Sequence, residues 1–477
     1  MQYHQIRLLA CFAFLILLFQ SCTKDEPFDL SDTGTEELRN DNQDGRDQRS
    51  ASRLVDTESE IALAWMDLFL EIERYAGGMR PNASARAIAY IHLAAYETGI
   101  PAMPDFQSNQ ERLRGLNIRR PASGQRLNWE VALNASYAAS TRHFLLNIDP
   151  ALENKIDELE TKLNAQYSNQ TSPQDLEASS EWGENVAQAV IAYSQTDQEA
   201  EAQVLDPQPH SYVPPTGLGY WTFSAEPERA LFPYWEKVRT FVISPEETTA
   251  IPPIAYSEDP SSEYYQQMLE VYESNNDAKA VDGEELWIAE FWSDDVEGLT
   301  FSPPARQVSI ARQLIDQFDL NLEETLHLNL KLGFALNDAA VAAWKYKYEF
   351  MVMRPNVFIH EYIDPDFQTN LYRLIPWPNP TFPSYPSGHS CFASAAGGVF
   401  IDFLGNEVNF TDRSHEGRTE FRGAARTFST VEEFAAENAF SRIPLGVHMR
   451  MDCTEGLRLG YEIADGINDY RLRRRKS

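Results

Sequence analysis

Hydrophobic side chains recur at a helical spacing along most of the chain. The first such stretch begins after Asp56 and presents large apolar side chains on one helical face: Ile61, Trp65, Leu68, Phe69 and Ile72. The run "NASARAIAYIHLAAYETGI" repeats the pattern after the break at "GGMRP". The same period predicts further helices at about 127–146, 150–166, 176–195, 262–274, 303–319, 322–353, 390–404, 430–439 and 452–468.

Alternation of apolar and polar residues, which marks a half-buried strand, is not seen over any comparable length. Between roughly 205 and 260 the chain is rich in proline and aromatic residues and is too irregular for a helix. A loop of this length is usually functional or packs across other elements. We therefore expect an all-α fold of helical bundles, arranged as two four-helix-bundle-like halves with long irregular loops.

The amino-terminal segment, residues 1–22, differs from the rest of the chain. Arg7 precedes the apolar run "LLACFAFLILLF" (8–19), which is too short to span a bilayer and is typical of a secretory signal. Because "QSC" follows, the segment resembles a bacterial lipoprotein signal in which Cys22 becomes the lipidated first residue. Phe19 and Gln20 depart from the usual pattern before that cysteine, and a plain cleaved signal peptide is the alternative.

The polar segment after the signal predicts where the protein is held. Its "KDE" (24–26) resembles the export tag that sends lipoproteins of Bacteroidota to the cell surface. Residues 23–55 are rich in Asp, Glu, Asn, Gly and Ser, and this composition predicts a disordered acidic tether. We expect an outer-membrane lipoprotein exposed at the cell surface, with the periplasm as the alternative. Residues 56–477 are expected to form the helical domain that carries the chemistry.

Charge and cysteine content narrow the functional classes. The 477-residue chain has a formal net charge of -32, and its only basic run is the terminal "RLRRRKS". This argues against nucleic acid as a partner, because a phosphate backbone needs a basic surface. Of four cysteines, only Cys391 and Cys453 follow the signal. Two cysteines make no disulfide framework, and the sequence leaves open whether these two are paired.

Three short stretches in the last third of the chain carry the candidate chemistry: "WKYKYEFMVMRP" (344–355), "PSGH" (386–389) and "SRIPLGVHMRMD" (441–452). Each charged residue or histidine in them alone has an ordinary reading, such as a solvated helix face or a buried core histidine. Together they match K-x6-RP, PSGH and SR-x5-H-x3-D in one order with every fixed spacing intact, which chance does not produce. The candidate site residues are Trp344, Lys347, Arg354, Ser387, Gly388, His389, Arg442, His448 and Asp452.

These residue types suit a tetrahedral oxyanion. Lys347, Arg354 and Arg442 supply positive charge, and the planar fork of arginine can hold two oxygens at once. Ser387 and Gly388 stand just ahead of a predicted helix, where unpaired N–H groups and the helix dipole favour a bound anion. Two histidines in one such site suit opposite tasks, because one can stay neutral and coordinate while the other exchanges protons.

The three motifs resemble the anion site shared by the vanadium-dependent haloperoxidases and the type 2 phosphatidic acid phosphatase superfamily. They cover residues 344–455, and "YVPPTGLGYW" (212–221), "IAEFWSDD" (288–295) and "PPARQVSIARQLI" (303–315) extend the resemblance, which is closest to secreted bacterial iodoperoxidases. The resemblance implies a vanadate cofactor and no haem. It also implies hydrogen peroxide and a halide as substrates, and leaves open whether an organic acceptor is used.

The resemblance further implies a role for each residue. His448 is expected to be the axial ligand of vanadium, with Asp452 orienting its other ring nitrogen. His389 is expected to be the acid–base residue, and Lys347 to polarise a peroxide oxygen. The oxygens of vanadate are expected to be held by one common set of residues: Lys347, Arg354, Ser387, Gly388, His389 and Arg442.

Trp344 and Phe382 bear on the choice of halide. Phe382 lies seven residues before His389, where the family has an aromatic residue in chloroperoxidases and some bacterial iodoperoxidases, and often histidine in bromoperoxidases. An apolar wall suits a large, weakly hydrated halide, so we expect iodide first, then bromide, with chloride least. Both aromatic residues fit an ordinary core position equally well.

Asp294 and Asp295 are candidates to brace a buried arginine from outside the site, or are ordinary surface acids. No role is expected for the histidines outside the three motifs, His415 among them.

Two other functions stay open. The same residues would hydrolyse phosphomonoesters through a phosphohistidine if His448 were the nucleophile and His389 the leaving-group acid. A non-enzymatic surface lipoprotein that binds glycans would explain the tether and the aromatic residues, but not the complete motif.

Overall fold

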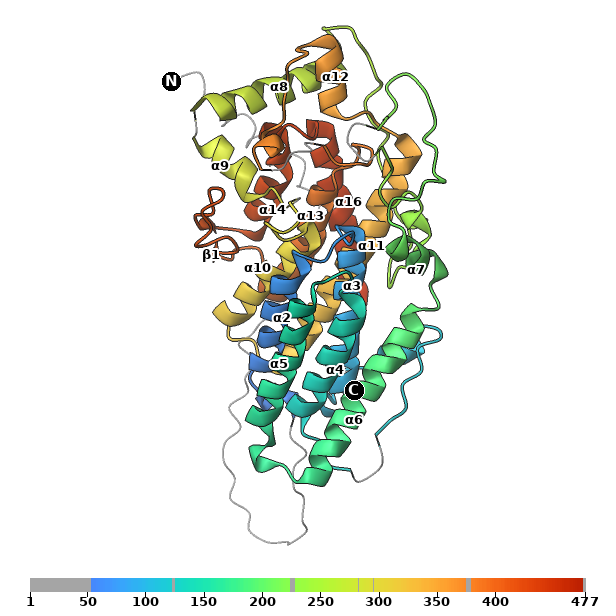
Figure 1. Ribbon diagram of the computed structural model, residues 1–477, viewed down its shortest axis with the longest axis vertical. Coiled ribbons are helices and arrows are strands. Elements are labelled where there is room, and N and C mark those ends of the chain that lie inside the picture. The colour runs from blue at the N-terminus through green and yellow to red at the C-terminus, as the bar shows by residue number, and fades with distance from the viewer. Residues whose placement is uncertain are drawn as a thin grey trace.

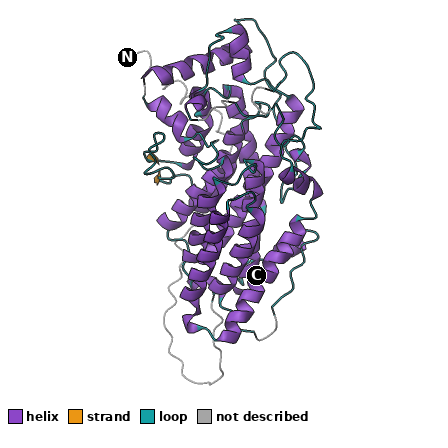
Figure 2. Cartoon of the chain, in the orientation of Figure 1, coloured by secondary structure: helices purple, strands orange, loops and turns teal. Residues whose placement is uncertain are grey.

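The computed structural model describes residues 53–121, 125–223, 228–281, 283–294, 296–374 and 379–474. The expected signal with Cys22, and nearly all of the expected tether, lie outside the described residues. Figure 2 shows that helices and loops make up nearly all of the described chain, with one pair of short strands. This confirms the all-α expectation.

Most long helices lie where the hydrophobic period predicts them. Four short helices (α7, α9, α12 and α15) and the strand pair were not predicted, because eight residues or fewer show too little of a period. The described elements are α2 (Glu60–Glu73), α3 (Asn82–Gly99), α4 (Trp129–Phe144), α5 (Pro150–Tyr167), α6 (Pro173–Ser194), α7 (Gln198–Leu205), α8 (Glu263–Val281), α9 (Glu284–Phe291), α10 (Pro303–Gln317), α11 (Leu322–Phe350), α12 (Pro355–Tyr362), α13 (Gly388–Leu404), β1 (Phe410–Asp412), β2 (Arg426–Phe428), α14 (Val431–Phe440), α15 (Arg442–Leu445) and α16 (Arg450–Asp469), with 3-10 turns at Leu54–Asp56, Ile100–Ala102, Asn109–Glu111, Ser168–Gln170, Trp235–Lys237 and Asn370–Arg373.

Helix α11 joins the two halves of the molecule (Figure 1). It has 29 residues, so it is about 44 Å long at the usual rise of about 1.5 Å per residue. It packs against α3 on one side and against α13 and α16 on the other. Helices α2 to α6 form the lower bundle in Figure 1. In the upper one α13, α14 and α16 pack on one another, and α13 and α16 also pack against α11.

Glycines allow the closest helix contacts. A Cβ on Gly333 of α11 would lie 2.8 Å from Ala89 Cα of α3. A Cβ on Gly456 of α16 would lie 2.5 Å from the carbonyl oxygen of Ser387, at the start of α13. Side chains at these two positions would force the helices apart, so glycine fixes how deeply α16 sits against the beginning of α13.

The irregular segment predicted between about 205 and 260 packs across the end of α11. The backbone N–H of Trp221 donates to the carbonyl of Met351 at 2.6 Å, just after α11 ends. The N–H of Leu231 donates to the carbonyl of Thr381 at 2.9 Å, and its own carbonyl accepts from the indole N–H of Trp344 at 3.2 Å. The loop therefore holds the first motif segment beside the residues that lead into the second.

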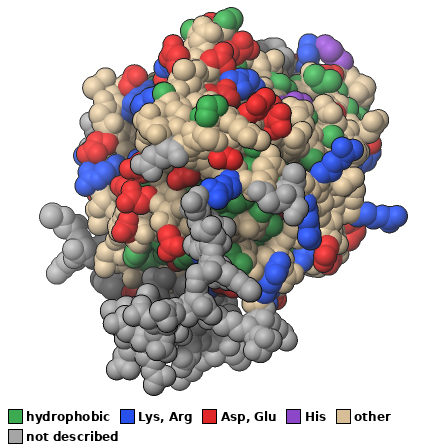
Figure 3. Space-filling view, turned by 90° about the horizontal axis from the view of Figure 1, so that it is seen from below, with side chains coloured by type: hydrophobic (Ala, Val, Ile, Leu, Met, Phe, Trp, Pro, Cys, Tyr) green, Lys and Arg blue, Asp and Glu red, His purple; other side chains and the backbone are tan. Residues whose placement is uncertain are grey.

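The surface carries charges of both signs. Seen from below, acidic and basic side chains are interspersed over the face in Figure 3, with hydrophobic side chains scattered singly between them. In the described part of the chain, no helix combines the length and the apolar character needed to cross a membrane.

Candidate active site

The three sequence motifs meet at one buried place in the upper half of the molecule. Lys347 lies in the last turn of α11, Ser387 is the N-cap of α13, and His448 lies between α15 and α16. Hydrogen bonds join the motifs, and all the polar residues concerned are buried. We call the following set the oxyanion cage: Lys347, Arg354, Ser387, Gly388, Arg442 and His448.

Lys347 is completely buried and holds the loop before α13. Its ammonium donates to three backbone carbonyls, those of Pro383 at 3.0 Å, Ser384 at 2.9 Å and Pro386 at 2.5 Å. Burial first, and then the nearby Arg354, hold the pKa of Lys347 well below its usual value of 10.5. The structure thus gives Lys347 a role in shaping the cage wall that the sequence did not suggest.

Arg354 connects the first motif to the third and to the segment that leads into the second. Its Nε donates to the carbonyl of Phe382 at 2.8 Å, and its Nη1 donates to the carbonyl of Val447 at 3.1 Å. The same Nη1 lies 3.2 Å from Nε2 of His448. Because Pro355 begins α12 directly after it, Arg354 takes an extended backbone conformation as the N-cap and projects back toward the cage.

His448 is hydrogen-bonded to a carboxylate. Its Nδ1 lies 3.0 Å from Oδ2 of Asp452, which also accepts the N–H of Met449 at 3.1 Å. A carboxylate accepts, so Nδ1 carries the proton and the lone pair is left on Nε2. Burial first, and then the cage cations, hold the pKa of His448 well below its usual 6.5, while burial raises the pKa of Asp452. Nε2 therefore accepts from Arg354, and a neutral imidazole whose Nε2 carries no proton is what a nitrogen ligand of vanadium requires.

Ser384 also belongs to the site, although sequence reasoning missed it. Its hydroxyl donates to Oδ2 of Asp452 and lies 3.4 Å from Nδ1 of His448. Its N–H donates to the carbonyl of Val352 at 2.9 Å. A serine two residues ahead of "PSGH" carries no signal of its own, because only the fold brings it beside Asp452.

The start of α13 forms one wall of the cage. The Ser387 hydroxyl accepts the N–H of Ser390 at 3.4 Å, and the Ser387 N–H donates to the carbonyl of Asp452 at 2.9 Å. A Cβ on Gly388 would lie 3.3 Å from the Trp344 ring, so glycine leaves the backbone room beside that ring. His389 follows in the first turn and is 6% exposed. The positive end of the α13 dipole is therefore directed at the cage.

Arg442 completes the cations of the cage. It begins α15, is 1% exposed, and donates from Nη1 to the carbonyl of Trp292 at 2.8 Å. Its charge is among those that lower the pKa of His448. In the sequence, Trp292 belongs to the segment "IAEFWSDD" (288–295) and carries no signal of its own. In the structure, its backbone carbonyl accepts a hydrogen bond from Arg442.

Trp344 and Phe382 form an aromatic wall beside the cations. Their ring centroids are 4.9 Å apart, with Trp344 buried and Phe382 only partly buried. The guanidinium carbon of Arg354 lies 4.8 Å from the Phe382 centroid, and Nζ of Lys347 lies 5.0 Å from it. The Phe382 ring face is thus attracted to two cations, which fixes the ring at the edge of the cage.

The structure also bears on the two cysteines and on two acidic residues outside the motifs. Cys391 and Cys453 are both free and buried, which answers the open question of pairing. Asp294 does contact a buried arginine, Arg306, whereas Asp295 lies outside the described residues. His415, for which no role was expected, also contacts Arg306.

The donor set fits an oxyanion such as vanadate. The three motifs contribute three buried cations, a hydroxyl, the N-terminal end of a helix and a neutral imidazole. Nε2 of that imidazole lies 3.2 Å from Nη1 of Arg354. Charge-assisted donors of this kind suit a tetrahedral anion with several oxygens, and the imidazole can supply one bond to its central atom.

Comparison with known proteins gives consistent results. A family model described as the VCPO second helical-bundle domain matches residues 327–475. The vanadium chloroperoxidase of Curvularia inaequalis is 27% identical over 214 residues, 34% of this chain and 35% of that protein. The vanadium-dependent bromoperoxidase of Ascophyllum nodosum is 34% identical over 94 residues, 18% of this chain and 17% of that protein. The chain thus spans about a third of the length of the first of these relatives and less of the second.

Solved structures extend the likeness to most of the chain. The crystal structure of a bacterial vanadium-dependent iodoperoxidase superposes with a TM-score of 0.78 and 25% identity, covering 88% of this chain and 99% of that one. A bacterial vanadium-dependent chloroperoxidase superposes with a TM-score of 0.63 and 16% identity, covering 82% of this chain and 92% of that one. The second likeness bears on the fold alone.

Proposed function

The chain belongs to the vanadium haloperoxidase family, and on that premise we propose that it oxidises halide ions with hydrogen peroxide, using orthovanadate held in the oxyanion cage. The observation that carries the proposal is His448, whose Nδ1 is bound to Asp452 while its Nε2 faces Arg354. The overall reaction consumes one halide, one hydrogen peroxide and one proton, and it yields hypohalous acid and water.

Vanadate, when bound, supplies a Lewis acid that activates hydrogen peroxide toward halide without changing its own oxidation state. The chain supplies the rest. Arg354, Arg442 and the start of α13 would neutralise the anion and keep it in one orientation, while the Nε2 of His448 would hold it from one end. His389, at the first turn of α13, would move the proton that the reaction consumes.

We propose iodide as the preferred halide, followed by bromide, with chloride least. Iodide is the easiest of the three to oxidise, so it needs the least activation of peroxide. The wall formed by Trp344 and Phe382 suits a large, weakly hydrated anion, and the likeness to a bacterial iodoperoxidase supports the same order.

The proposal is tested by assaying the full purified chain, loaded with orthovanadate, with hydrogen peroxide and each halide in turn. A phosphomonoester is assayed beside them, since the same cage would serve a phosphatase. We expect halide oxidation that excess phosphate abolishes, because both anions need the same donors. His448→Ala should lose tight vanadate retention. Full vanadium content in that variant, or turnover of the phosphomonoester alone, would refute the assignment.

We also propose that the protein is an outer-membrane lipoprotein held at the cell surface through Cys22. Support comes from the leucine-rich signal that ends at Cys22 and from the "KDE" that follows it. In this arrangement the lipid is the only contact with the membrane, and the hypohalous acid is released outside the cell.

A further inference from the structure

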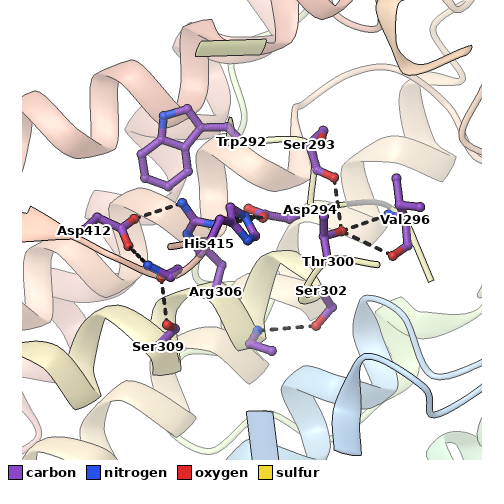
Figure 4. A network of polar contacts seen from close by, with 12 residues as sticks. Trp292, Ser293, Asp294, Val296, Thr300, Ser302, Arg306, Ser309, Asp412 and His415 are labelled. Carbon is purple, nitrogen blue, oxygen red and sulfur yellow. Dashed lines mark hydrogen bonds and ion pairs between the residues drawn. The ribbon is translucent and has the colours of Figure 1, made fainter. Parts of the chain in front are cut away.

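A second cluster of buried polar groups lies outside the oxyanion cage (Figure 4). Arg306 of α10 is completely buried. Its Nη2 donates to Oδ2 of Asp412 at 2.9 Å, and its Nη1 lies 3.5 Å from Oδ1 of Asp294, with both carboxyl groups also completely buried. Nη1 also contacts Nε2 of His415. We call these four residues the Arg306 cluster.

The protonation of the Arg306 cluster follows from its chemistry. A guanidinium only donates, so Nε2 of His415 accepts from Arg306 and the ring is neutral. Burial first, and then Arg306, hold the pKa of His415 well below 6.5, which agrees with that assignment. The pKa of Asp412 is lowered although burial opposes this, because Arg306 and hydrogen bonds from Ser414 outweigh burial. The guanidinium is therefore held by acceptors along its edges.

Two aromatic rings also lie against the same guanidinium, with their centroids 5.1 Å apart. Its central carbon lies 4.4 Å from the centroid of Phe291 and 4.6 Å from that of Trp292, the residues at the end of α9. The indole N–H of Trp292 donates to Oε1 of Glu437 at 2.9 Å. Trp292 is completely buried, so its ring is fixed by a cation on its face and a carboxylate at its edge.

The carbonyl of Trp292 connects this cluster to the cage. It accepts from Nη1 of Arg442 at 2.8 Å, and it stands at the C-terminal end of α9, where the helix dipole is negative. A guanidinium has its donors in a rigid planar fork. Fixing one of them on a rigid carbonyl therefore restricts the directions in which the others can point.

We propose that the Arg306 cluster is a positioning element for the anion site: it fixes Trp292, whose carbonyl aims the guanidinium of Arg442 at the bound oxyanion. Arg306 touches neither the anion nor the reacting atoms, and acts through Trp292. This inference rests on the proposed function, because it takes orthovanadate as the ligand.

The test is a double-mutant cycle read out as orthovanadate binding to the full chain by calorimetry. Arg306→Gln should weaken binding by about 10- to 100-fold, the usual effect of losing an outer-shell partner. In an Arg442→Lys background the same substitution should change affinity by no more than about twofold, because lysine has no fork to orient. Arg312→Gln is the matched control, since Arg312 lies on the same helix in a surface ion pair with Asp67. Its binding should equal that of the wild type.

Urea denaturation of each variant separates loss of fold from loss of affinity. If Arg306→Gln does not fold, His415→Leu takes its place in the cycle, because it removes one acceptor and leaves every charge of the cluster intact. Equal losses of affinity in the two backgrounds, or unchanged affinity in a folded Arg306→Gln variant, would overturn the inference alone. A wild-type chain that binds no orthovanadate would overturn the proposed function and the inference with it.

Discussion

Gly456 sits where α16 comes closest to the beginning of α13, and its replacement tests whether helix packing sets the geometry of the cage. A Cβ at this position would lie 2.5 Å from the carbonyl oxygen of Ser387 and 2.7 Å from Cβ of Ser390. Both atoms are fixed by the backbone of α13, so neither can rotate away. Gly456→Ala must therefore push α13 and α16 apart.

Two opposing effects set the magnitude. Alanine in place of glycine within a helix adds about 1 kcal/mol to the free energy of unfolding. Overpacking a filled interior costs about 1–3 kcal/mol, and a clash with backbone favours the upper end. We expect a net loss of about 2 kcal/mol. Because Ser387 forms part of the cage, and a shift of about 1 Å can cost about 100-fold at a site, orthovanadate binding should weaken by at least about tenfold.

Gly397→Ala, on α13, is the matched control. A Cβ there would meet Val431 Cγ1 at 3.5 Å and Ala435 Cβ at 3.7 Å, which are ordinary contacts. This variant should gain up to about 1 kcal/mol and bind orthovanadate as the wild type does. Urea denaturation followed by circular dichroism, with calorimetric titration of orthovanadate, measures both quantities. A Gly456→Ala protein as stable as Gly397→Ala, with unchanged affinity, would refute the reasoning.

Three further outcomes are expected. Orthovanadate or phosphate at about 100 times its dissociation constant should raise the free energy of unfolding by about 2.7 kcal/mol in urea denaturation, and an unmoved midpoint would contradict binding to the folded state. Burial lowers the pKa of His92 to about 3 from 6.5, so the unfolded chain binds the extra proton. Stability should therefore fall as the pH drops below about 6.5, by up to about 1.4 kcal/mol per unit from this group, and His92→Gln should reduce that slope in denaturation at several pH values. Cys22→Ala should abolish labelling by a radioactive lipid precursor, and unchanged labelling would exclude anchoring there.

The long helices could be predicted because their period extends over many residues. In α11 and α16 the apolar face repeats over five or more turns, so an error at one position changes little. The strand pair gave no such signal, because Phe410 faces Phe428 and Asp412 faces Arg426 over only three residues on each side. Helix α9 was not predicted either, because it has only 8 residues. The carbonyl of Trp292, at its C-terminal end, nevertheless accepts a hydrogen bond from Arg442.

Motif residues could be predicted because each motif is a short stretch with a fixed internal spacing. His448 and Asp452 are four residues apart, and the first turn of α16 brings their side chains within 3.0 Å. Arg306 and His415 are more than a hundred residues apart, and nothing in the chain around either one indicates that they meet. An arginine on an amphipathic helix has the same local pattern whether it faces solvent or core. Such side chains are found only once the fold has been determined.

Backbone carbonyls explain how like charges can be gathered in the cage. Carbonyls accept from Lys347, Arg354 and Arg442, and Lys347 alone uses three of them. A carbonyl satisfies an N–H donor and carries no net charge, so it stabilises a buried cation without neutralising it. Asp452 is directed at His448, where its charge orients a ligand. The cage therefore keeps a positive potential in a rigid arrangement, which a multiply charged oxyanion can then occupy with little rearrangement.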